Sequence, residues 1–237
     1  MTYVLVHGGG MTARCWDPLL PHLGEPAVAV DLPGRAGDGI DVAGVAVADF
    51  VDRVVDVIEG ADLHDVVLVG HSLAGITLPG VAAAVPDRLR RLVFVSAAVP
   101  PDGGTVGAIL GTLGPELEHL AVRLGDDLVD PSGTLHADLA IAMFCNDLDD
   151  AGTAFVLEGL SGESLAVLDE PVGLSGLGDL PRTYVRLLQD ASIVLATQDR
   201  MVEHLGGPGV VDVVDIDAGH MVMMGDPAAL AAVLRAC

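Results

Sequence analysis

Residues 66–75 read Val-Val-Leu-Val-Gly-His-Ser-Leu-Ala-Gly, a short apolar run that ends at a serine between small residues. The run Val66–Val69 has the length and composition of a buried strand, and a segment of helical character follows it. A tight turn from strand to helix needs small residues two positions before and after its centre, because the backbone is crowded there. Gly70 and Ala74 supply them around Ser72. The stretch therefore predicts an α/β protein with a serine nucleophile at residue 72.

Similar apolar runs recur along the chain, and segments of helical character separate them. The runs predict six strands, at Tyr3–Val6, Ala27–Val30, Val66–Val69, Leu92–Val95, Tyr184–Leu188 and Val210–Ile216. Helices are predicted at about Val45–Glu59, Ile76–Val85, Gln198–Leu205 and Pro227–Arg235. Runs that are continuously apolar are typical of a parallel sheet with helices on both faces. We therefore expect a mainly parallel sheet of about six strands flanked by helices.

The alternation of strand and helix stops between the fourth and fifth predicted strands. Three segments in this interval have helical character, at Val106–Leu124, His136–Phe144 and Asp149–Leu157. A structureless loop of that length is uncommon in a compact domain, so an inserted helical subdomain is the better interpretation. We expect residues 100–181 to form a helical lid, or cap, and residues 1–99 and 182–237 to form the core.

The charge of the chain excludes several function classes. There are 34 acidic residues and 11 basic ones, the formal net charge is −23, and every basic residue is arginine. Chemistry that depends on lysine, such as a Schiff base or a phosphate-loop lysine, is therefore excluded. So acidic a surface repels a phosphate backbone and argues against nucleic acid as a partner. Cys15, Cys145 and Cys237 lack the spacing of a disulfide framework or a metal site.

The chain shows no sign of a membrane segment. No stretch approaches the ~20 uninterrupted apolar residues that span a bilayer. The N-terminus enters a predicted strand without a basic leader, so we expect a cytoplasmic protein with no membrane partner. The sequence leaves open whether the chain forms a homodimer.

Chemically active residues follow the ends of four predicted strands. In order they are the loop His7–Gly10, then Ser72, Asp190 and His220. A site forms outside the carboxyl ends of the strands in an open parallel sheet. Serine needs an adjacent base, and that base needs a carboxylate to orient it, so these residues are candidates for a catalytic triad. The chain order serine, aspartate, histidine is that of nucleophile-elbow hydrolases.

Other acids lie close to the expected carboxylate along the chain. Asp215 is predicted to lie within a strand, and Asp217 is too close to His220 along the same loop. Asp199 is a further candidate, but Asp190 follows the predicted strand Tyr184–Leu188 through Gln189 and is preferred. The glycines of residues 8–10 lack the spacing of a dinucleotide-binding loop, so a nucleotide site is disfavoured.

The motifs resemble the α/β-hydrolase fold, and within it the lid-bearing branch that contains plant methyl esterases, hydroxynitrile lyases and many bacterial esterases. The opening Val4–Gly10 followed by Cys15-Trp16 is similar to that branch, as is Asp31-Leu32-Pro33-Gly34 after the second strand. Gly219-His220-Met221 resembles its histidine loop. The resemblance covers most of the chain outside residues 101–181.

The resemblance implies a role for each matching residue. Ser72 would be the nucleophile, His220 the general base and acid, and Asp190 the carboxylate that orients it. The backbone amides of Gly9 and Leu73 would form the oxyanion hole. The residues expected to bind substrate are Trp16, Met143, Phe144 and Met221. The implied reaction is hydrolysis of a small ester through an acyl-enzyme intermediate, which requires no metal and no organic cofactor.

The same scaffold also supports other activities. Lyases of this branch carry a lysine after the catalytic histidine and a threonine in the first loop, where this chain has Met221 and Gly8. An esterase is therefore favoured over a hydroxynitrile lyase. A biosynthetic cyclase and a non-catalytic ligand-binding relative remain alternatives. We expect an apolar, uncharged acyl group, because Arg123 and Arg182 are the only basic residues within or beside the predicted lid.

Overall fold

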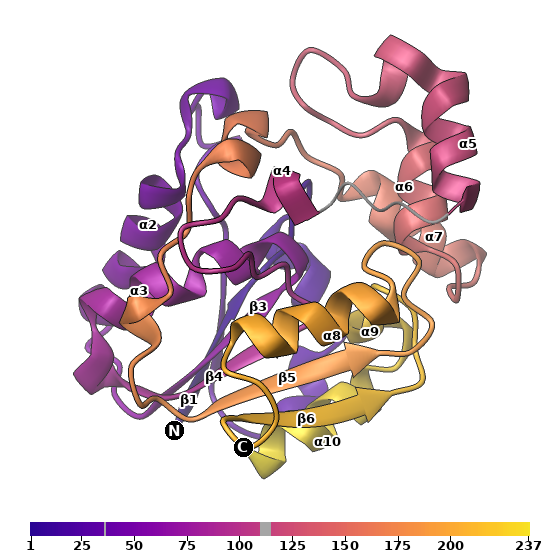
Figure 1. Ribbon diagram of the computed structural model, residues 1–237. Helices are drawn as coiled ribbons and strands as arrows, with labels where there is room; N and C mark the ends of the chain where they lie inside the picture. The colour runs from indigo at the N-terminus through magenta and orange to yellow at the C-terminus, as the bar shows by residue number, and fades with distance from the viewer. Residues whose placement is uncertain (36, 110–114) are drawn as a thin grey trace.

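A computed structural model describes residues 1–35, 37–109 and 115–237 of the chain. Six strands form one sheet in the order β2-β1-β3-β4-β5-β6, and all neighbouring strands are parallel (Figure 1). The strands are β1 (Thr2–Val6), β2 (Ala27–Val30), β3 (Val66–His71), β4 (Leu89–Val95), β5 (Arg182–Leu187) and β6 (Val211–Ile216). Each of the six predicted strands is present, and the predicted parallel sheet flanked by helices is confirmed.

Helices connect the strands and cover both faces of the sheet. They are α1 (Leu20–Leu23), α2 (Val47–Gly60), α3 (Leu78–Ala84), α4 (Val106–Ile109), α5 (Pro115–Leu124), α6 (Ala137–Phe144), α7 (Asp150–Glu158), α8 (Leu195–His204), α9 (Val222–Gly225) and α10 (Pro227–Ala236). None of the helices in the described part of the chain has the length and the hydropathy to cross a membrane.

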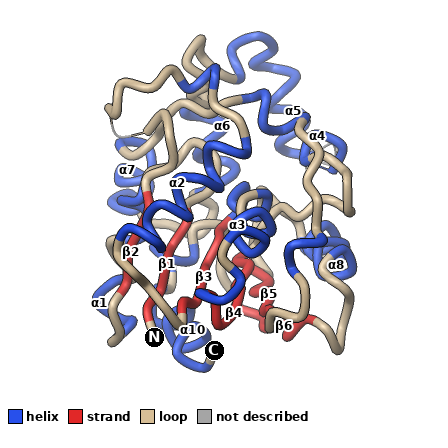
Figure 2. The backbone as a smooth tube through the Cα atoms, turned by 90° about the vertical axis from the view of Figure 1, so that its left-hand side faces the viewer, coloured by secondary structure: helices blue, strands red, loops and turns tan. Residues whose placement is uncertain are grey.

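The core has two halves, one on each face of the sheet. Alternate side chains of a strand point to opposite faces. In β1, Val4 and Val6 therefore belong to the half of the core that includes residues of α2, α3 and α8, whereas Tyr3 and Leu5 belong to the half that includes residues of α1 and α10. Figure 2 shows α2 and α3 in front of the sheet. Burial of both faces explains why these strands read as continuous apolar runs.

The segment between β4 and β5 holds the helices α4–α7. In both views α5, α6 and α7 lie together at the end of the molecule opposite the two termini (Figures 1 and 2). The predicted helix Val106–Leu124 corresponds to α4 and α5, and residues 110–114 between them lie outside the described residues. Near the end of the segment, the 3-10 helix η7 (Ser175–Leu177) packs on α3.

Candidate active site

Ser72 lies in a strained turn between β3 and the 3-10 helix η3 (Ser72–Ile76). Its φ of 53° falls in the left-handed region that residues other than glycine seldom adopt. The Ser72 carbonyl accepts a hydrogen bond of 2.8 Å from the Ala98 amide, which follows β4. Strain of this kind persists only where the surrounding structure holds it, and it is typical of functional positions. The sequence predicted this turn from the small residues around the serine.

The nucleophile-elbow motif Gly-x-Ser-x-Gly has glycine where this chain has Ala74, and Gly70 leaves room for the alanine. A Cβ placed on Gly70 would lie 3.3 Å from the Ala74 methyl group and within 2.4 Å of Leu78 Cδ1. Because Gly70 has no side chain, the Ala74 methyl group and Leu78 fill that space. Alanine at residue 74 therefore leaves the strained conformation of Ser72 intact.

Asp190 follows β5 and is held by four hydrogen-bond donors. Its Oδ2 accepts bonds of 2.7 Å from His220 Nδ1 and from Ser96 Oγ. Its Oδ1 accepts bonds from the amides of Ser192 and Ile193, at 2.7 and 2.8 Å. Burial raises the pKa of the carboxyl, but His220 and the hydrogen bonds outweigh burial, and the pKa of Asp190 is lowered. Asp190 is therefore a carboxylate at neutral pH.

Ser96 is a contact of the site to which sequence reasoning assigned no role. It directly follows β4, is fully buried, and has a φ of 38°, which turns its hydroxyl toward Asp190. The sequence contained one signal for it, its place at the end of a strand neighbouring β3. Ser96 bonds Oδ2 of the Asp190 carboxylate, whereas the loop amides bond Oδ1.

His220 lies after β6, and its ring is buried between two others. The Phe144 ring is stacked on it, with centroids 5.3 Å apart and planes 17° apart, and the His71 ring lies at 4.5 Å. Since the Asp190 carboxylate can only accept, His220 Nδ1 carries the proton of this hydrogen bond. The second nitrogen, Nε2, is therefore free to act as a base.

His71 holds the histidine loop in place from the residue next to Ser72. Its Nε2 lies 2.9 Å from the His220 carbonyl oxygen, which can only accept, so Nε2 carries a proton. Burial and the neighbouring His220 hold the pKa of His71 well below its usual range. His71 is therefore neutral, and its Nδ1 is buried with no hydrogen-bond partner among the described residues.

The glycine loop after β1 is fixed by His7. His7 Nδ1 donates to the Gly8 carbonyl at 2.8 Å, and Nε2 accepts from the Leu32 amide at 3.2 Å. Burial lowers the pKa of His7 to about 4, so the ring is neutral in this arrangement. A Cβ on Gly8 would lie 2.8 Å from Ser72 Cβ, so the loop approaches the serine as closely as only glycine permits.

An ion pair absent from the sequence predictions lies behind this loop. Arg35 Nη2 is 2.6 Å from Glu163 Oε2, and the two side chains are 0% and 10% exposed. The same oxygen accepts from the Gly10 amide at 3.2 Å, while the Gly10 carbonyl accepts from the Ser161 amide at 2.8 Å. Gly10 is thus held on both sides by the segment between β4 and β5.

A cavity of about 150 Å³ opens at Ser72. Its wall includes Gly9 and Leu73, which carry the two amides expected to form the oxyanion hole. Most of the remaining lining is apolar, including Val106, Val129, Leu135, Met143, Phe144 and Ile193. Glu163 contributes a carboxylate to the wall. Five residues predicted to act in catalysis or binding therefore line one cavity, namely Gly9, Ser72, Leu73, Met143 and Phe144.

Trp16 and Met221 were expected to bind substrate, but the structure places both outside the described wall of this cavity. Trp16 is fully buried in the core and lies edge-on to His71, with centroids 6.3 Å apart. Met221 is buried beside a separate small hollow. A large apolar side chain has the same sequence signature in a pocket as in a core, so this distinction required the structure.

The other acids near the site are engaged elsewhere. Arg186 pairs with Asp199 and Asp215, at 2.6 and 2.8 Å. Asp217 accepts a hydrogen bond of 2.8 Å from Gln189 Nε2. Asp190 is therefore the acid that meets His220.

Known proteins are similar to this chain in sequence and in fold. The sequence matches the alpha/beta hydrolase family over residues 3–233. It is 27% identical to the pyrethroid hydrolase of Sphingobium wenxiniae over 241 residues, which cover 96% of this chain and 84% of that protein. It is 29% identical to methylesterase 9 of Arabidopsis thaliana over 244 residues, which cover 95% of this chain and 93% of that protein.

Solved structures of similar proteins extend over nearly the whole chain. One is an extracellular alpha/beta-hydrolase from a Paenibacillus species, described as sharing structural and functional homology with tobacco salicylic acid binding protein 2. It aligns with a TM-score of 0.81 at 27% identity, covering 99% of this chain and 97% of that one.

Proposed function

Because this chain belongs to the alpha/beta hydrolase family, we propose that it hydrolyses carboxylic esters of small, largely apolar substrates by a serine mechanism. Two of the similar proteins are named as a pyrethroid hydrolase and a methylesterase, and both names describe hydrolysis. The proposal rests on the strained turn that presents Ser72 to the cavity and on the His220–Asp190 pair, whose histidine ring stacks on Phe144 of the cavity wall.

The proposed reaction has two halves. In the first, Ser72 Oγ attacks the ester carbonyl while His220 Nε2 takes its proton, and the same proton then goes to the departing alcohol. In the second, His220 takes a proton from water, the hydroxide attacks the acyl-serine, and the proton returns to Ser72 as the acid leaves. Asp190 orients His220 and stabilises the charged imidazolium through the bond of 2.7 Å.

The negative charge that develops on the carbonyl oxygen needs donors in a fixed position. We assign this role to the amides of Gly9 and Leu73, which belong to the cavity wall beside Ser72. The two hydrogen bonds of His7 and the two of Gly10 hold the loop that carries Gly9. A donor that is already in place stabilises the transition state without reorganisation, so rigidity of this loop serves the reaction.

The chemistry of the cavity favours an uncharged substrate. Its lining is mainly apolar, and Met143 and Phe144 supply part of the surface that would contact the substrate. The two arginines that sequence reasoning considered for an anion are engaged elsewhere. Arg123 pairs with Asp138, and Arg182 donates to backbone carbonyls, including that of Leu180. Nothing in the described lining offers a positive charge to a carboxylate on the substrate.

We assign residues 100–181 the role of a lid. Phe144 at the end of α6 is stacked on His220, and Ser161 and Glu163 bond to Gly10. The segment thus contacts the base and the loop of the oxyanion donors. Apolar surface over the site excludes water and strengthens the electrostatic interactions within it.

Hydrolysis of p-nitrophenyl acetate by wild type and Ser72→Ala tests the proposal. Loss of the nucleophile of a triad lowers kcat by several powers of ten, so we expect a loss of about 10³-fold or more. Ser175→Ala, at an exposed serine in η7, is the matched control and keeps wild-type activity. A phosphonate that reacts with serine is expected to label wild type, and mass spectrometry would locate it at Ser72.

Equal activity of wild type and Ser72→Ala would refute the serine esterase. Turnover of a cyanohydrin or a cyclisation substrate without ester cleavage would favour the lyase or cyclase alternatives. Ligand binding without turnover of any ester would favour a non-catalytic relative.

A further inference from the structure

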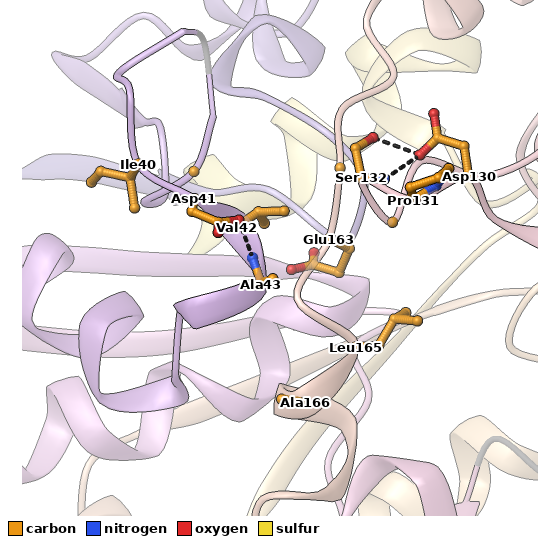
Figure 3. Close-up of a pocket in the computed structure, with 13 residues that line it drawn as sticks. Ile40, Asp41, Val42, Ala43, Asp130, Pro131, Ser132, Glu163, Leu165 and Ala166 are labelled. Carbon is orange, nitrogen blue, oxygen red and sulfur yellow. Dashed lines mark hydrogen bonds between the residues drawn. The ribbon is translucent and has the colours of Figure 1, made fainter.

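A second, larger cavity adjoins the one at Ser72. It has a volume of about 500 Å³, and the two cavities share Gly133, Glu163 and Leu165 in their walls. Figure 3 shows its walls coming from three parts of the chain, with Ile40–Ala43 on the left, Asp130–Ser132 on the right, and the segment of Glu163, Leu165 and Ala166 between and below them. We call the cavity at Ser72 the inner cavity and this one the outer cavity.

We propose that the outer cavity is the far part of the substrate site and binds the distal end of the ester's acyl group. This inference rests on the proposed ester hydrolysis and extends it to a substrate class, namely esters of medium-length, uncharged, apolar acids.

Size is the first observation that supports this inference. Ligand sites in proteins commonly measure ~300–1,000 Å³. The inner cavity, at about 150 Å³, falls below that range and accommodates only the reacting ester group and a short chain. With the outer cavity added, the site lies well within the range. The shared residues place the junction directly beside the reacting centre.

The position of the junction determines which part of the substrate enters the outer cavity. Glu163, at the junction, bonds to Gly10 next to the proposed oxyanion donor Gly9. His220, which must protonate the leaving alcohol, lies against Phe144 instead. Phe144 lines the inner cavity but not the outer one. The alcohol is therefore placed on the His220 side, and the acyl chain is directed toward Glu163 and the outer cavity.

The lining determines the chemistry of the occupant. Ile40 and Leu165 are 51% and 49% exposed, which is unusual for large apolar side chains, and both belong to the outer cavity. Asp41 and Asp130 add carboxylates, and none of the described lining residues is an arginine or a histidine. Arg35 offsets the charge of Glu163 but not of the two aspartates. An apolar chain fits this lining, whereas a carboxylate at its end would be repelled.

The inference is tested by filling the outer cavity from each wall. Ala166 and Ala43 line it and are exposed, so Ala166→Trp and Ala43→Trp place a large ring in the cavity without disturbing the core. The matched control is Ala232→Trp, at an exposed alanine of α10 outside both cavities. Thermal unfolding checks that each variant folds. The substrates are p-nitrophenyl acetate and p-nitrophenyl octanoate, which differ only in acyl length.

We expect kcat/KM for the octanoate to fall by about tenfold in both variants of the outer cavity, equivalent to roughly 1.4 kcal/mol. The value for the acetate stays within about twofold, because its acyl group fits the inner cavity. The control changes neither substrate. Equal effects on acetate and octanoate, or no effect on either, would overturn the inference even if hydrolysis depends on Ser72. Acetate hydrolysis that does not depend on Ser72 would instead refute the proposed function.

Two further substrates test which end of the ester enters the outer cavity and whether that cavity excludes a negative charge. If octyl acetate is slowed in the Trp variants and p-nitrophenyl octanoate is not, the alcohol occupies the outer cavity and our assignment is wrong. The p-nitrophenyl monoester of octanedioic acid has a carboxylate at the end of the same chain. We expect its kcat/KM to be at least about tenfold below that of the octanoate. In Asp41→Asn and Asp130→Asn, we expect the difference in kcat/KM between the two esters to be smaller, because each variant removes one carboxylate from the cavity wall. Equal turnover of the two esters by wild type would overturn the predicted exclusion of anions.

Discussion

At the scale of single residues, Glu163 places a negative charge beside the proposed oxyanion hole, where the reaction itself develops a negative charge. Its Oε2 bonds to Gly10 and lies 3.3 Å from where a Cβ of Gly9 would be. An oxyanion held by the Gly9 amide would be repelled by this carboxylate. For a separation on the order of 6 Å and an effective dielectric constant of ~20, the repulsion is roughly 3 kcal/mol. Arg35, paired with Glu163 and fully buried, offsets it.

A double-mutant cycle on Arg35 and Glu163 separates the effect of charge on kcat from the effect of side-chain packing. We expect Arg35→Met to lower kcat by roughly 10- to 100-fold, because it leaves the Glu163 carboxylate unpaired beside the oxyanion. Glu163→Gln removes the charge, keeps an acceptor for the Gly10 amide and has a smaller effect. In Arg35→Met/Glu163→Gln, kcat returns to within a few-fold of the Glu163→Gln value. The measurements are kcat and KM for p-nitrophenyl acetate.

Thermal unfolding of all three variants is the control for this cycle, because an unpaired buried carboxylate also destabilises the fold. The charge effect should appear in kcat rather than in KM. A double variant as slow as Arg35→Met would show that Arg35 acts through packing alone.

The candidate site was predictable where its residues follow strand ends. Ser72, Asp190 and His220 each follow an apolar run in the expected order, although their roles stay a prediction until the variants are measured. The pairing of Arg35 with Glu163 could not be predicted from the sequence. The two residues lie far apart along the chain, and the many acidic residues offer no spacing that would identify the partner of Arg35. Ser96 was missed because Phe94 stands two positions before it, so the pattern of small residues that marks the turn at Ser72 is absent there.

At the scale of elements, His7 connects the ends of two neighbouring strands. It is the first residue after β1 and bonds the Leu32 amide in the loop after β2. Both hydrogen bonds require a neutral ring, with the proton on Nδ1. The position of the oxyanion loop relative to β2 therefore depends on the protonation state of one buried side chain.

This dependence predicts how stability changes with pH. The pKa of His7 is about 4 in the folded protein, against about 6.5 in an unfolded chain. Between these values the unfolded state binds more protons, so the free energy of unfolding falls as the pH falls. The full contribution of His7 is present above pH ~6.5, and roughly 3 kcal/mol is lost by pH ~4. Urea unfolding at several pH values measures it.

The variant His7→Gln should weaken this dependence. His7→Gln is less stable than wild type at pH 7, and the difference shrinks toward pH 4. The matched control is the exposed His22, where glutamine should leave the pH dependence unchanged. An unaltered slope in His7→Gln would assign the effect to other groups, such as His71, whose pKa is also lowered by burial.

The strands were easier to predict than the segment that covers them. A strand buried on both faces is mostly apolar, so β1, β3 and the second half of β4 stand out as runs rich in valine and leucine. Between β4 and β5, short helices alternate with turns, and η7 packs on α3 of the core. Hydrophobic patterning is weak in short helices, so the boundaries of residues 100–181 as a lid stay a prediction.

At the scale of the whole molecule, the excess of acidic residues sets the response to salt. The net charge is −23, and several arginines are already paired, among them Arg88, Arg91 and Arg186. Repulsion among the remaining carboxylates opposes the compact state. The cytoplasmic location stays a prediction, because composition does not decide it.

We expect added salt to stabilise the protein. The screening length falls from ~10 Å at 0.1 M to ~3 Å at 1 M salt, so repulsion between carboxylates is reduced. A gain of about 1 kcal/mol would raise Tm by roughly 2–4 °C in a protein of this size. Calorimetry in NaCl and in KCl measures this, and the two salts should agree because screening does not depend on the cation. A fall in Tm would mean that the ion pairs of the surface outweigh the repulsion.

Trp16 can serve as an intrinsic fluorescence probe of the candidate active site. It is the single tryptophan of the chain, it is shielded from water, and its ring lies edge-on to His71, which in turn touches His220. Emission excited at the tryptophan band therefore originates from one known place, two ring contacts from the proposed base. Events at that base can be followed in real time by stopped-flow fluorescence, with the unlabelled wild-type protein and any ester.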